Sequence, residues 1–151
     1  MSEKQKADKI YNKVLKEVIY PLIGDKTTYL TQLTAVGKSL FKNKYYGTFP
    51  SDKIPKLTDK KPYCILNLDS SEKAGSHWVA LAKHKNVCYL YDSFGRKATM
   101  IIPNLAFSGN GRILNTDDDV EQKVKEVNCG ARCLAFLYVF DKHGADVAKL
   151  I

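Results

Sequence analysis

The first 45 residues carry apolar side chains at helical spacing. The first amphipathic stretch spans residues 8–20 and places its apolar residues near one stripe, with lysines elsewhere. Pro21 and Gly24 are expected to end this helix. A second helix is predicted from about Thr28 to Phe41. Residues 43–62 contain several prolines, a glycine and lysines, which predict a loop.

After residue 62 the pattern changes to short apolar or alternating runs between turn residues, which are typical of strands. Three strands are expected, at Tyr63–Leu68, His77–His84 and Val87–Tyr91. Residues 95–116 fit no single pattern, although 100–102 and 112–114 could each form a short strand. Residues 117–126 could form a helical turn. A strong helix is predicted over 129–142, ended by Gly144, and a short last helix over 145–150.

This order of elements, helices first, then a strand meander and a helix that packs on the sheet, indicates an α+β fold. The 151 residues are expected to form a single domain, 1–151, with a helical N-terminal part (1–45) and a core (46–151). A chain of this length buries roughly 70% of its unfolded surface, enough for a core without disulfides.

The composition is that of an ordinary soluble protein, with 44% hydrophobic and 26% charged residues. No apolar run approaches the roughly 18 residues of a membrane span, and the charged N-terminus lacks the apolar stretch of a secretory signal. We therefore expect an intracellular protein without membrane contact, in which disulfides are disfavoured. A zinc site at Cys129 and Cys133 is also disfavoured, because the chain has no second ligand pair of the usual spacing.

The net charge of +8 comes mostly from lysine. A basic surface favours anionic partners such as nucleic acid. The lysines are, however, spread along the chain rather than clustered, which is equally typical of a solvated surface. Charge alone leaves both interpretations open.

A two-residue hairpin loop at Lys85-Asn86 would fix the register of two strands. His84 would pair with Val87, and His77 and Asp92 would become diagonal neighbours on one face, roughly 7–8 Å apart at the backbone. A carboxylate at that distance can hold an imidazole in one tautomer and stabilise its cation. A slip by one residue would separate the two side chains.

The other two histidines do not fit such a pair. His84 lies at the far end of the hairpin, on the opposite face from His77. His143 lies near the end of the last long helix, roughly 21 Å from Cys129 at about 1.5 Å per residue. Only His77 is expected to reach both Asp92 and Cys129.

Cys129 is expected at the start of the last long helix, where the helix dipole and unpaired N–H groups favour a thiolate. Gly130 would leave room for a substrate, and the N–H group of Cys129 could face an oxyanion. The amide of Gln122 could donate to the same oxyanion without adding a charge. The other cysteines, Cys64, Cys88 and Cys133, are expected to be core residues. Each candidate taken singly is more typical of an ordinary core or surface position, so the hypothesis rests on their combination and order.

Several motifs together resemble the adenovirus-type maturation proteases, in particular those of virophages and related mobile elements. The motifs are Gly75-Ser76-His77-Trp78-Val79, Tyr91-Asp92-Ser93-Phe94-Gly95, Gln122, Asn128-Cys129-Gly130 and Cys133-Leu134-Ala135-Phe136, preceded by Gly47-Thr48-Phe49-Pro50-Ser51-Asp52 with Ile54-Pro55. The resemblance extends more distantly to the ubiquitin-like-protein-specific cysteine proteases. It covers about residue 47 to the end, and the first 45 residues match no motif.

The resemblance implies a papain-like cysteine protease fold of the adenain type. In this fold a central, mostly antiparallel sheet is flanked by helices, the catalytic cysteine opens a helix, and 46–151 would be the catalytic core. His77 would be the base, Asp92 the residue that orients it, Gln122 the oxyanion donor and Cys129 the nucleophile. Substrate would contact Gly130 and Trp78, which could alternatively support His77.

The implied activity is an endopeptidase that cleaves after small residues, at Gly-Gly or Gly-x-Gly sites, in viral capsid or core precursors during virion maturation. Such an enzyme would be a monomer in the host cytoplasm or virus factory and would be packaged in the virion. No cofactor is expected to be required. Adenovirus relatives use DNA and a disulfide-linked peptide as activators. The net charge of +8 leaves stimulation by nucleic acid open for this chain. Dependence on an activating peptide is not inferred from the resemblance.

Three alternatives remain open at this point. A deubiquitinase or deSUMOylase-like effector of the same superfamily would share all four catalytic residues, although 151 residues leave little room for a docking surface. An acyltransferase with a similar triad is a second alternative. The third is a non-catalytic, basic nucleic-acid-binding or capsid-associated protein.

Overall fold

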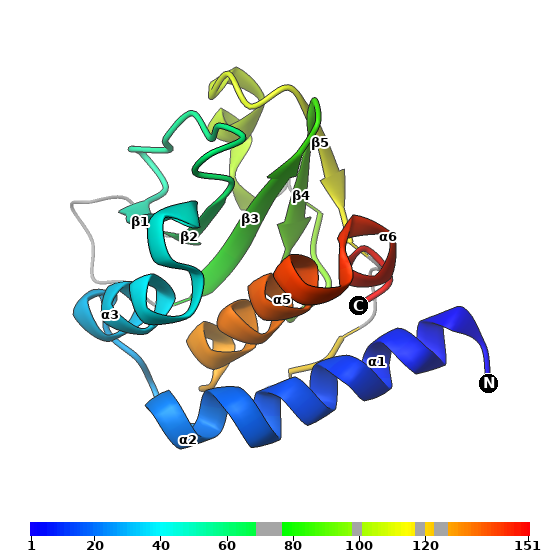
Figure 1. Cartoon of the computed structure of the whole chain (residues 1–151). Coiled ribbons are helices and arrows are strands. Elements are labelled where there is room, and N and C mark those ends of the chain that lie inside the picture. Colours follow the sequence, from blue (N-terminus) through cyan, green and yellow to red (C-terminus); the bar gives the residue numbers. More distant parts are fainter. Residues whose placement is uncertain (69–76, 98–100, 117–119, 123–126) are drawn as a thin grey trace.

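A mixed β-sheet lies at the centre of the computed structural model, which describes residues 1–68, 77–97, 101–116, 120–122 and 127–151 (Figure 1). Within these residues the sheet has five strands in the order β1-β2-β3-β4-β5. The strands are β1 (Tyr45–Pro50), β2 (Tyr63–Asn67), β3 (Trp78–His84), β4 (Val87–Tyr91) and β5 (Arg112–Asn115). β2, β3 and β4 pair antiparallel, while β1 and β5 pair parallel at the two edges.

The α-helices pack on one side of this sheet, whereas the short turn η3 packs with its Leu105 in the cluster on the other side (Figure 1). The first three elements are α1 (Glu3–Val14), a π-helical turn η1 (Leu15–Ile19) and α2 (Tyr20–Ile23). They are followed by α3 (Leu30–Phe41), the 3₁₀ turns η2 (Lys42–Lys44) and η3 (Pro103–Phe107), α5 (Cys129–His143) and α6 (Ala145–Ala148). α5 packs against β3, and α1 and α3 in turn pack against α5. The N-terminal helices therefore share one core with the sheet.

The sheet buries both faces, which explains why its central strands are almost wholly apolar. On the helical side, Ala80 and Ala82 of β3 leave room for α5, and Phe136 of α5 stacks on Tyr91 with ring centroids 4.9 Å apart. On the other side, Val79 and Leu81 join a second cluster. Three cysteines predicted to be core residues are fully buried in these clusters: Cys64, Cys88 and Cys133.

The α+β class and the three central strands are confirmed. The hairpin register is also confirmed, since His84 pairs with Val87 and Ala80 pairs with Tyr91. The short strand predicted over 112–114 is present as β5, and the helix predicted over 129–142 is α5. The sheet is mixed rather than mostly antiparallel, because the two edge pairings are parallel.

The loop predicted over 43–62 is wrong in its first part, which forms β1. Pro50 is tolerated there because it ends an edge strand. The first helix starts at Glu3 rather than 8, because Ser2 and Gln5 form a capping box. Pro21 does not end the helical segment, since it lies in the first turn of α2, where its missing N–H group is not needed. The segment continues to Ile23, directly before Gly24.

The predicted elements at 100–102 and 117–126 fall partly outside the described residues. Ile102 leads into η3 and is not in a strand, while Met100 lies outside the described part. Of the predicted helical turn, residues 120–122 are not helical, and 117–119 and 123–126 are not described. The last helix ends at Ala148, two residues before the predicted 150.

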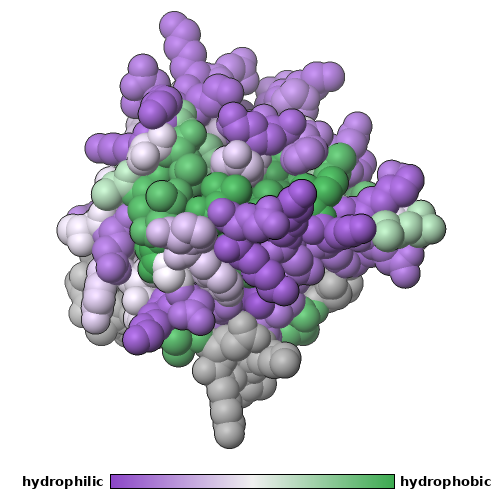
Figure 2. All heavy atoms as spheres, turned by 60° about the horizontal axis from the view of Figure 1, so that its bottom comes forward, coloured by the Kyte–Doolittle hydropathy of each residue, from purple (hydrophilic) through white to green (hydrophobic). Residues whose placement is uncertain are grey.

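The outward side of α1 and of the following turn η1 carries a row of exposed lysines at helical spacing: Lys6, Lys9 and Lys13 in α1, and Lys16 in η1. Figure 2 shows the underside of the molecule, where hydrophilic side chains cover most of the face and a hydrophobic band lies between them. None of the helices in the described part of the chain is both long and apolar enough to span a bilayer.

Candidate active site

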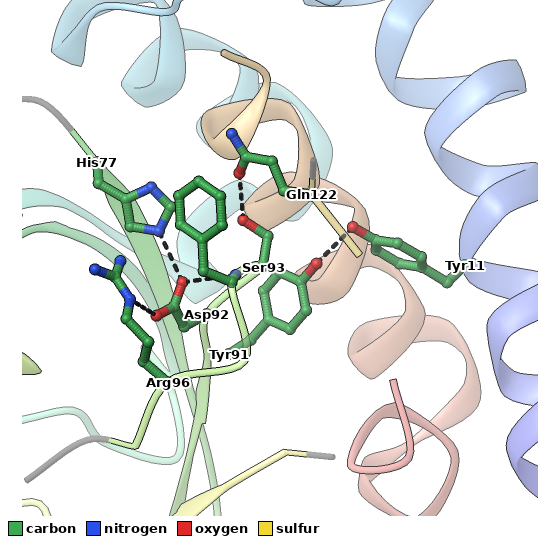
Figure 3. A network of polar contacts seen from close by, with 8 residues as sticks. Tyr11, His77, Tyr91, Asp92, Ser93, Arg96 and Gln122 are labelled. Atoms are coloured by element: carbon green, nitrogen blue, oxygen red, sulfur yellow. Dashed lines mark hydrogen bonds and ion pairs between the residues drawn. The ribbon is translucent and has the colours of Figure 1, made fainter. Parts of the chain in front are cut away.

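His77 and Asp92 lie side by side at the ends of neighbouring strands, as the hairpin register predicts. His77 directly precedes β3, and Asp92 directly follows β4. The imidazole Nε2 lies 2.7 Å from Asp92 Oδ1, and both side chains are buried (Figure 3). With Nε2 held by the carboxylate, Nδ1 is the ring nitrogen left for another partner.

A tight turn after β4 surrounds this pair with Phe94, which the hairpin register places opposite His77, and with Arg96, which the sequence did not single out. Asp92 C=O accepts a hydrogen bond from the N–H group of Gly95, whose φ of 70° favours glycine. The turn brings Arg96 back to Asp92, with Nε 2.7 Å from Oδ2, and stacks the Phe94 ring on His77 with centroids 4.7 Å apart. Phe94 N–H also donates to Asp92 Oδ1. The imidazole is thus fixed by the carboxylate at its edge and by the ring at its face.

The carboxyl group of Asp92 stays ionised in this setting. Burial alone would raise its pKa, but hydrogen bonds from His77, Arg96 and the Phe94 N–H group outweigh burial and lower the pKa below its ordinary value. The partly exposed Arg96 guanidinium therefore helps to keep a negative charge beside His77.

Cys129 is the first residue of α5, and it and His77 each shift the pKa of the other. Burial raises the pKa of the thiol, but the His77 hydrogen bond and charge, together with N–H groups of Trp78 and Gly130, lower it below the ordinary value. Burial lowers the pKa of His77, while hydrogen bonds to Asp92 and Cys129 outweigh this and raise it. Opposite shifts in one pair favour a thiolate beside an imidazolium.

The other three cysteines differ in this respect. Burial raises the pKa of Cys88 to about 12 and holds the pKa values of Cys64 and Cys133 well above the ordinary range. All four cysteines are free thiols. Cys129 is therefore the one cysteine of this chain whose surroundings favour the thiolate.

Gln122 is buried beside Ser93, the neighbour of Asp92. Ser93 Oγ donates to Gln122 Oε1 over 2.5 Å, and Ser93 C=O accepts the N–H group of Gln122 over 3.0 Å. Because the amide oxygen is engaged by Ser93, the amide nitrogen is turned away from it (Figure 3). Ser93 thus fixes the orientation of the proposed oxyanion donor, a role that no periodicity in the sequence indicates.

The two predicted substrate contacts, Trp78 and Gly130, are both buried. The Trp78 indole N–H lies 3.4 Å from Thr28 C=O, and its backbone N–H group helps to lower the pKa of the Cys129 thiol, so this residue supports the site. A Cβ at Gly130 would lie 2.0 Å from Thr28 Oγ1 and 3.0 Å from Leu33. The explanation of Gly130 as space for a substrate is therefore corrected, because Thr28 fills that space. Substrate contact at either residue stays a prediction.

The remaining histidines lie away from this site, as the sequence predicts. His84 and His143 line a groove of about 890 Å³ at the far end of the hairpin. Among the described residues, no group of three or more His, Cys, Asp or Glu side chains could hold a metal ion.

Comparison with known proteins adds no relative: no family model matches the chain, and a search of curated proteins finds no match. The functional conclusion therefore depends on the geometry and on the motifs themselves.

Proposed function

We propose that this protein is a cysteine endopeptidase with Cys129 as its nucleophile. The observation that carries the proposal is the 2.7 Å contact of His77 with Asp92, together with the opposite pKa shifts that His77 and Cys129, the first residue of α5, cause in each other. It joins a charged carboxylate, an imidazole with a raised pKa and a thiol with a lowered pKa. This is the arrangement that nucleophilic catalysis by cysteine needs.

In the proposed reaction the Cys129 thiolate attacks the carbonyl carbon of the scissile peptide bond. The developing oxyanion accepts hydrogen bonds from the N–H group of Cys129 and the amide of Gln122. The His77 imidazolium then gives its proton to the leaving amine, and the C–N bond breaks to leave a thioester. Water, deprotonated by His77, hydrolyses the thioester and returns the thiol, while Asp92 holds Nε2 throughout.

The narrowness of the site supports a substrate with small residues at the cleavage point. Cys129, His77 and Trp78 are only 5%, 7% and 7% exposed, so bulky side chains would not pass beside them. Glycine-containing sites of the Gly-Gly or Gly-x-Gly type fit this restriction. With the motifs described above, we infer an adenain-type fold and cleavage of viral structural precursors during virion maturation. The enzyme would act in the host cytoplasm or virus factory and enter the virion.

The direct test compares the wild type with Cys129→Ala on fluorogenic peptides containing Gly-Gly and Gly-x-Gly sites. We expect the variant to lose cleavage while its circular dichroism spectrum is unchanged. His84→Ala and His143→Ala serve as matched controls and should remain active, because both residues lie in the remote groove. Retained cleavage in Cys129→Ala would refute the proposal. Ubiquitin-like fluorogenic substrates and acetyl-CoA, assayed in parallel, would reveal deubiquitinase or acyltransferase activity instead.

A second candidate, nucleic-acid binding, is favoured by the exposed lysines of α1. Lys9 and Lys13 of α1 and Lys16 of η1 are exposed along one side of this helical segment, within a chain of net charge +8. Phosphate contacts through such a row would weaken steeply as salt is raised. Lys9→Glu/Lys13→Glu should then reduce DNA binding measured by fluorescence anisotropy. If DNA binds without changing peptide cleavage, the protein binds nucleic acid but is not stimulated by it.

A further inference from the structure

The residue before the proposed nucleophile does not do what its position predicts. Asn128 is the N-cap of α5, yet its side chain makes no capping hydrogen bond to the helix. Asparagine at this position ordinarily accepts the N–H group of the second or third helical residue. Here Nδ2 donates to the Tyr20 hydroxyl over 2.7 Å, and Oδ1 accepts from Arg132 Nε over 3.2 Å.

Both partners of Asn128 are held in turn by the N-terminal part of the chain. Tyr20 belongs to α2 itself. Arg132 is buried one turn along α5, and its Nη1 donates to the Tyr11 hydroxyl of α1 over 3.2 Å. The Tyr11 hydroxyl is hydrogen-bonded to that of Tyr91 over 2.6 Å, and Tyr91 directly precedes Asp92 (Figure 3). The network thus connects the neighbours of two proposed catalytic residues through α1 and α2.

The N–H groups in the first turn of α5 stay accessible, because the Asn128 side chain does not cap the helix. Gly130 is the second helical residue, so its N–H group has no acceptor within the helix, and this group helps to lower the pKa of the Cys129 thiol. An N-cap side chain in its ordinary conformation would compete for this same N–H group. Helix-terminal N–H groups stabilise a thiolate when no other acceptor takes them.

We propose that Tyr20 and Arg132 are positioning residues that hold the Asn128 side chain away from the α5 N-terminus, so that its N–H groups serve the Cys129 thiolate. This gives the N-terminal helices a role in thiol activation. The catalytic meaning of this role rests on the proposed function, whereas its effect on thiol reactivity does not.

Two substitutions at Asn128 separate this role from a merely structural one. Serine is too short to reach Tyr20 and Arg132 but is a good helix cap, whereas alanine can neither reach nor cap. Cys129 should therefore react with iodoacetamide about tenfold more slowly in Asn128→Ser than in Asn128→Ala at about pH 6. The reason is that the serine hydroxyl accepts an N–H group that would otherwise form a charge-assisted hydrogen bond with the thiolate. The serine variant should nevertheless be the more stable of the two in urea denaturation. A structural role alone predicts that stability and reactivity change in the same direction.

Tyr20→Phe tests the network from the other end. It should slow Cys129 labelling at about pH 6 and lower kcat for peptide cleavage with little change in KM. Tyr45→Phe is the control, because it loses a hydroxyl hydrogen bond of similar length, 2.6 Å to Thr48, away from Asn128. Equal labelling of the two Asn128 variants, or equal loss in Tyr20→Phe and Tyr45→Phe, would overturn the inference. If the labelling order holds but the wild type cleaves no peptide, only the proposed function fails.

Discussion

Removing the Ser93 hydroxyl should impair turnover through Gln122 alone. In Ser93→Ala the amide oxygen of Gln122 loses a 2.5 Å hydrogen bond in a buried setting. The backbone hydrogen bond from Gln122 N–H to Ser93 C=O remains, so the segment should stay in place while the amide turns more freely. We expect about 1–2 kcal/mol lower stability, the magnitude of a buried acceptor left without its donor.

The loss of kcat in Ser93→Ala should not exceed the loss in Gln122→Ala. Loss of one oxyanion donor lowers kcat by about 10²–10³, which is our expectation for Gln122→Ala. In Ser93→Ala the Gln122 amide is misoriented but still present, so kcat should fall by less, on the order of tenfold, with KM nearly unchanged. Because Ser93 acts through Gln122, the double variant should be no slower than Gln122→Ala.

The assay is steady-state cleavage of a Gly-Gly peptide by the wild type, Ser93→Ala, Gln122→Ala and the double variant, and urea denaturation measures the stability of each. Ser108→Ala is the matched control, since that hydroxyl also donates a short hydrogen bond, 2.6 Å to Leu105 C=O, outside the site. Additive losses in the double variant would refute the reasoning, because they would mean that Ser93 acts independently of Gln122. A loss of equal size in Ser108→Ala would attribute the effect to stability.

Two further predictions follow from the same geometry. Asp92→Asn removes the charge that raises the pKa of His77, so the alkaline limb of the pH profile of kcat/KM should move to lower pH as His77 loses its proton sooner. An unchanged alkaline limb would contradict the ion pair. Gly130→Ala should lower stability by about 1–3 kcal/mol in urea denaturation, because the new Cβ meets Thr28 Oγ1. Adding Thr28→Ala should restore part of this loss. A Gly130→Ala variant as stable as the wild type would contradict this packing.

The sequence predicted those parts of the fold that depend on local pattern. The alternation in β3 and β4, with two residues between them, fixed the register and so the approach of His77 to Asp92. β1 was not predicted from the sequence. Its pairing with β2 is parallel and non-local, and its own glycine and proline are typical of a loop. The true start of α1 was accessible, since Ser2 and Gln5 have the spacing of a capping box.

The surroundings of the site were less accessible to sequence analysis. The hairpin register predicted the approach of Phe94 to His77. Arg96, in contrast, reaches Asp92 because a tight turn at Gly95 reverses the chain, and no hydrophobic period reports such a turn. The contact of Asn128 with Tyr20 joins residues 108 positions apart, so only the packing of α2 beside α5 creates it. The distinct character of Cys129 among four cysteines likewise depends on tertiary neighbours.

The most direct test of the central claim is to trap the nucleophile with a Gly-Gly peptide that carries a vinyl sulfone in place of the scissile carbonyl, followed by peptide mapping by mass spectrometry. The account predicts a single adduct on Cys129, with none on Cys64, Cys88 or Cys133, whose thiol pKa values are raised by burial. An adduct on any of these three, or the same extent of modification in Cys129→Ala, would contradict the assignment of Cys129 as the nucleophile.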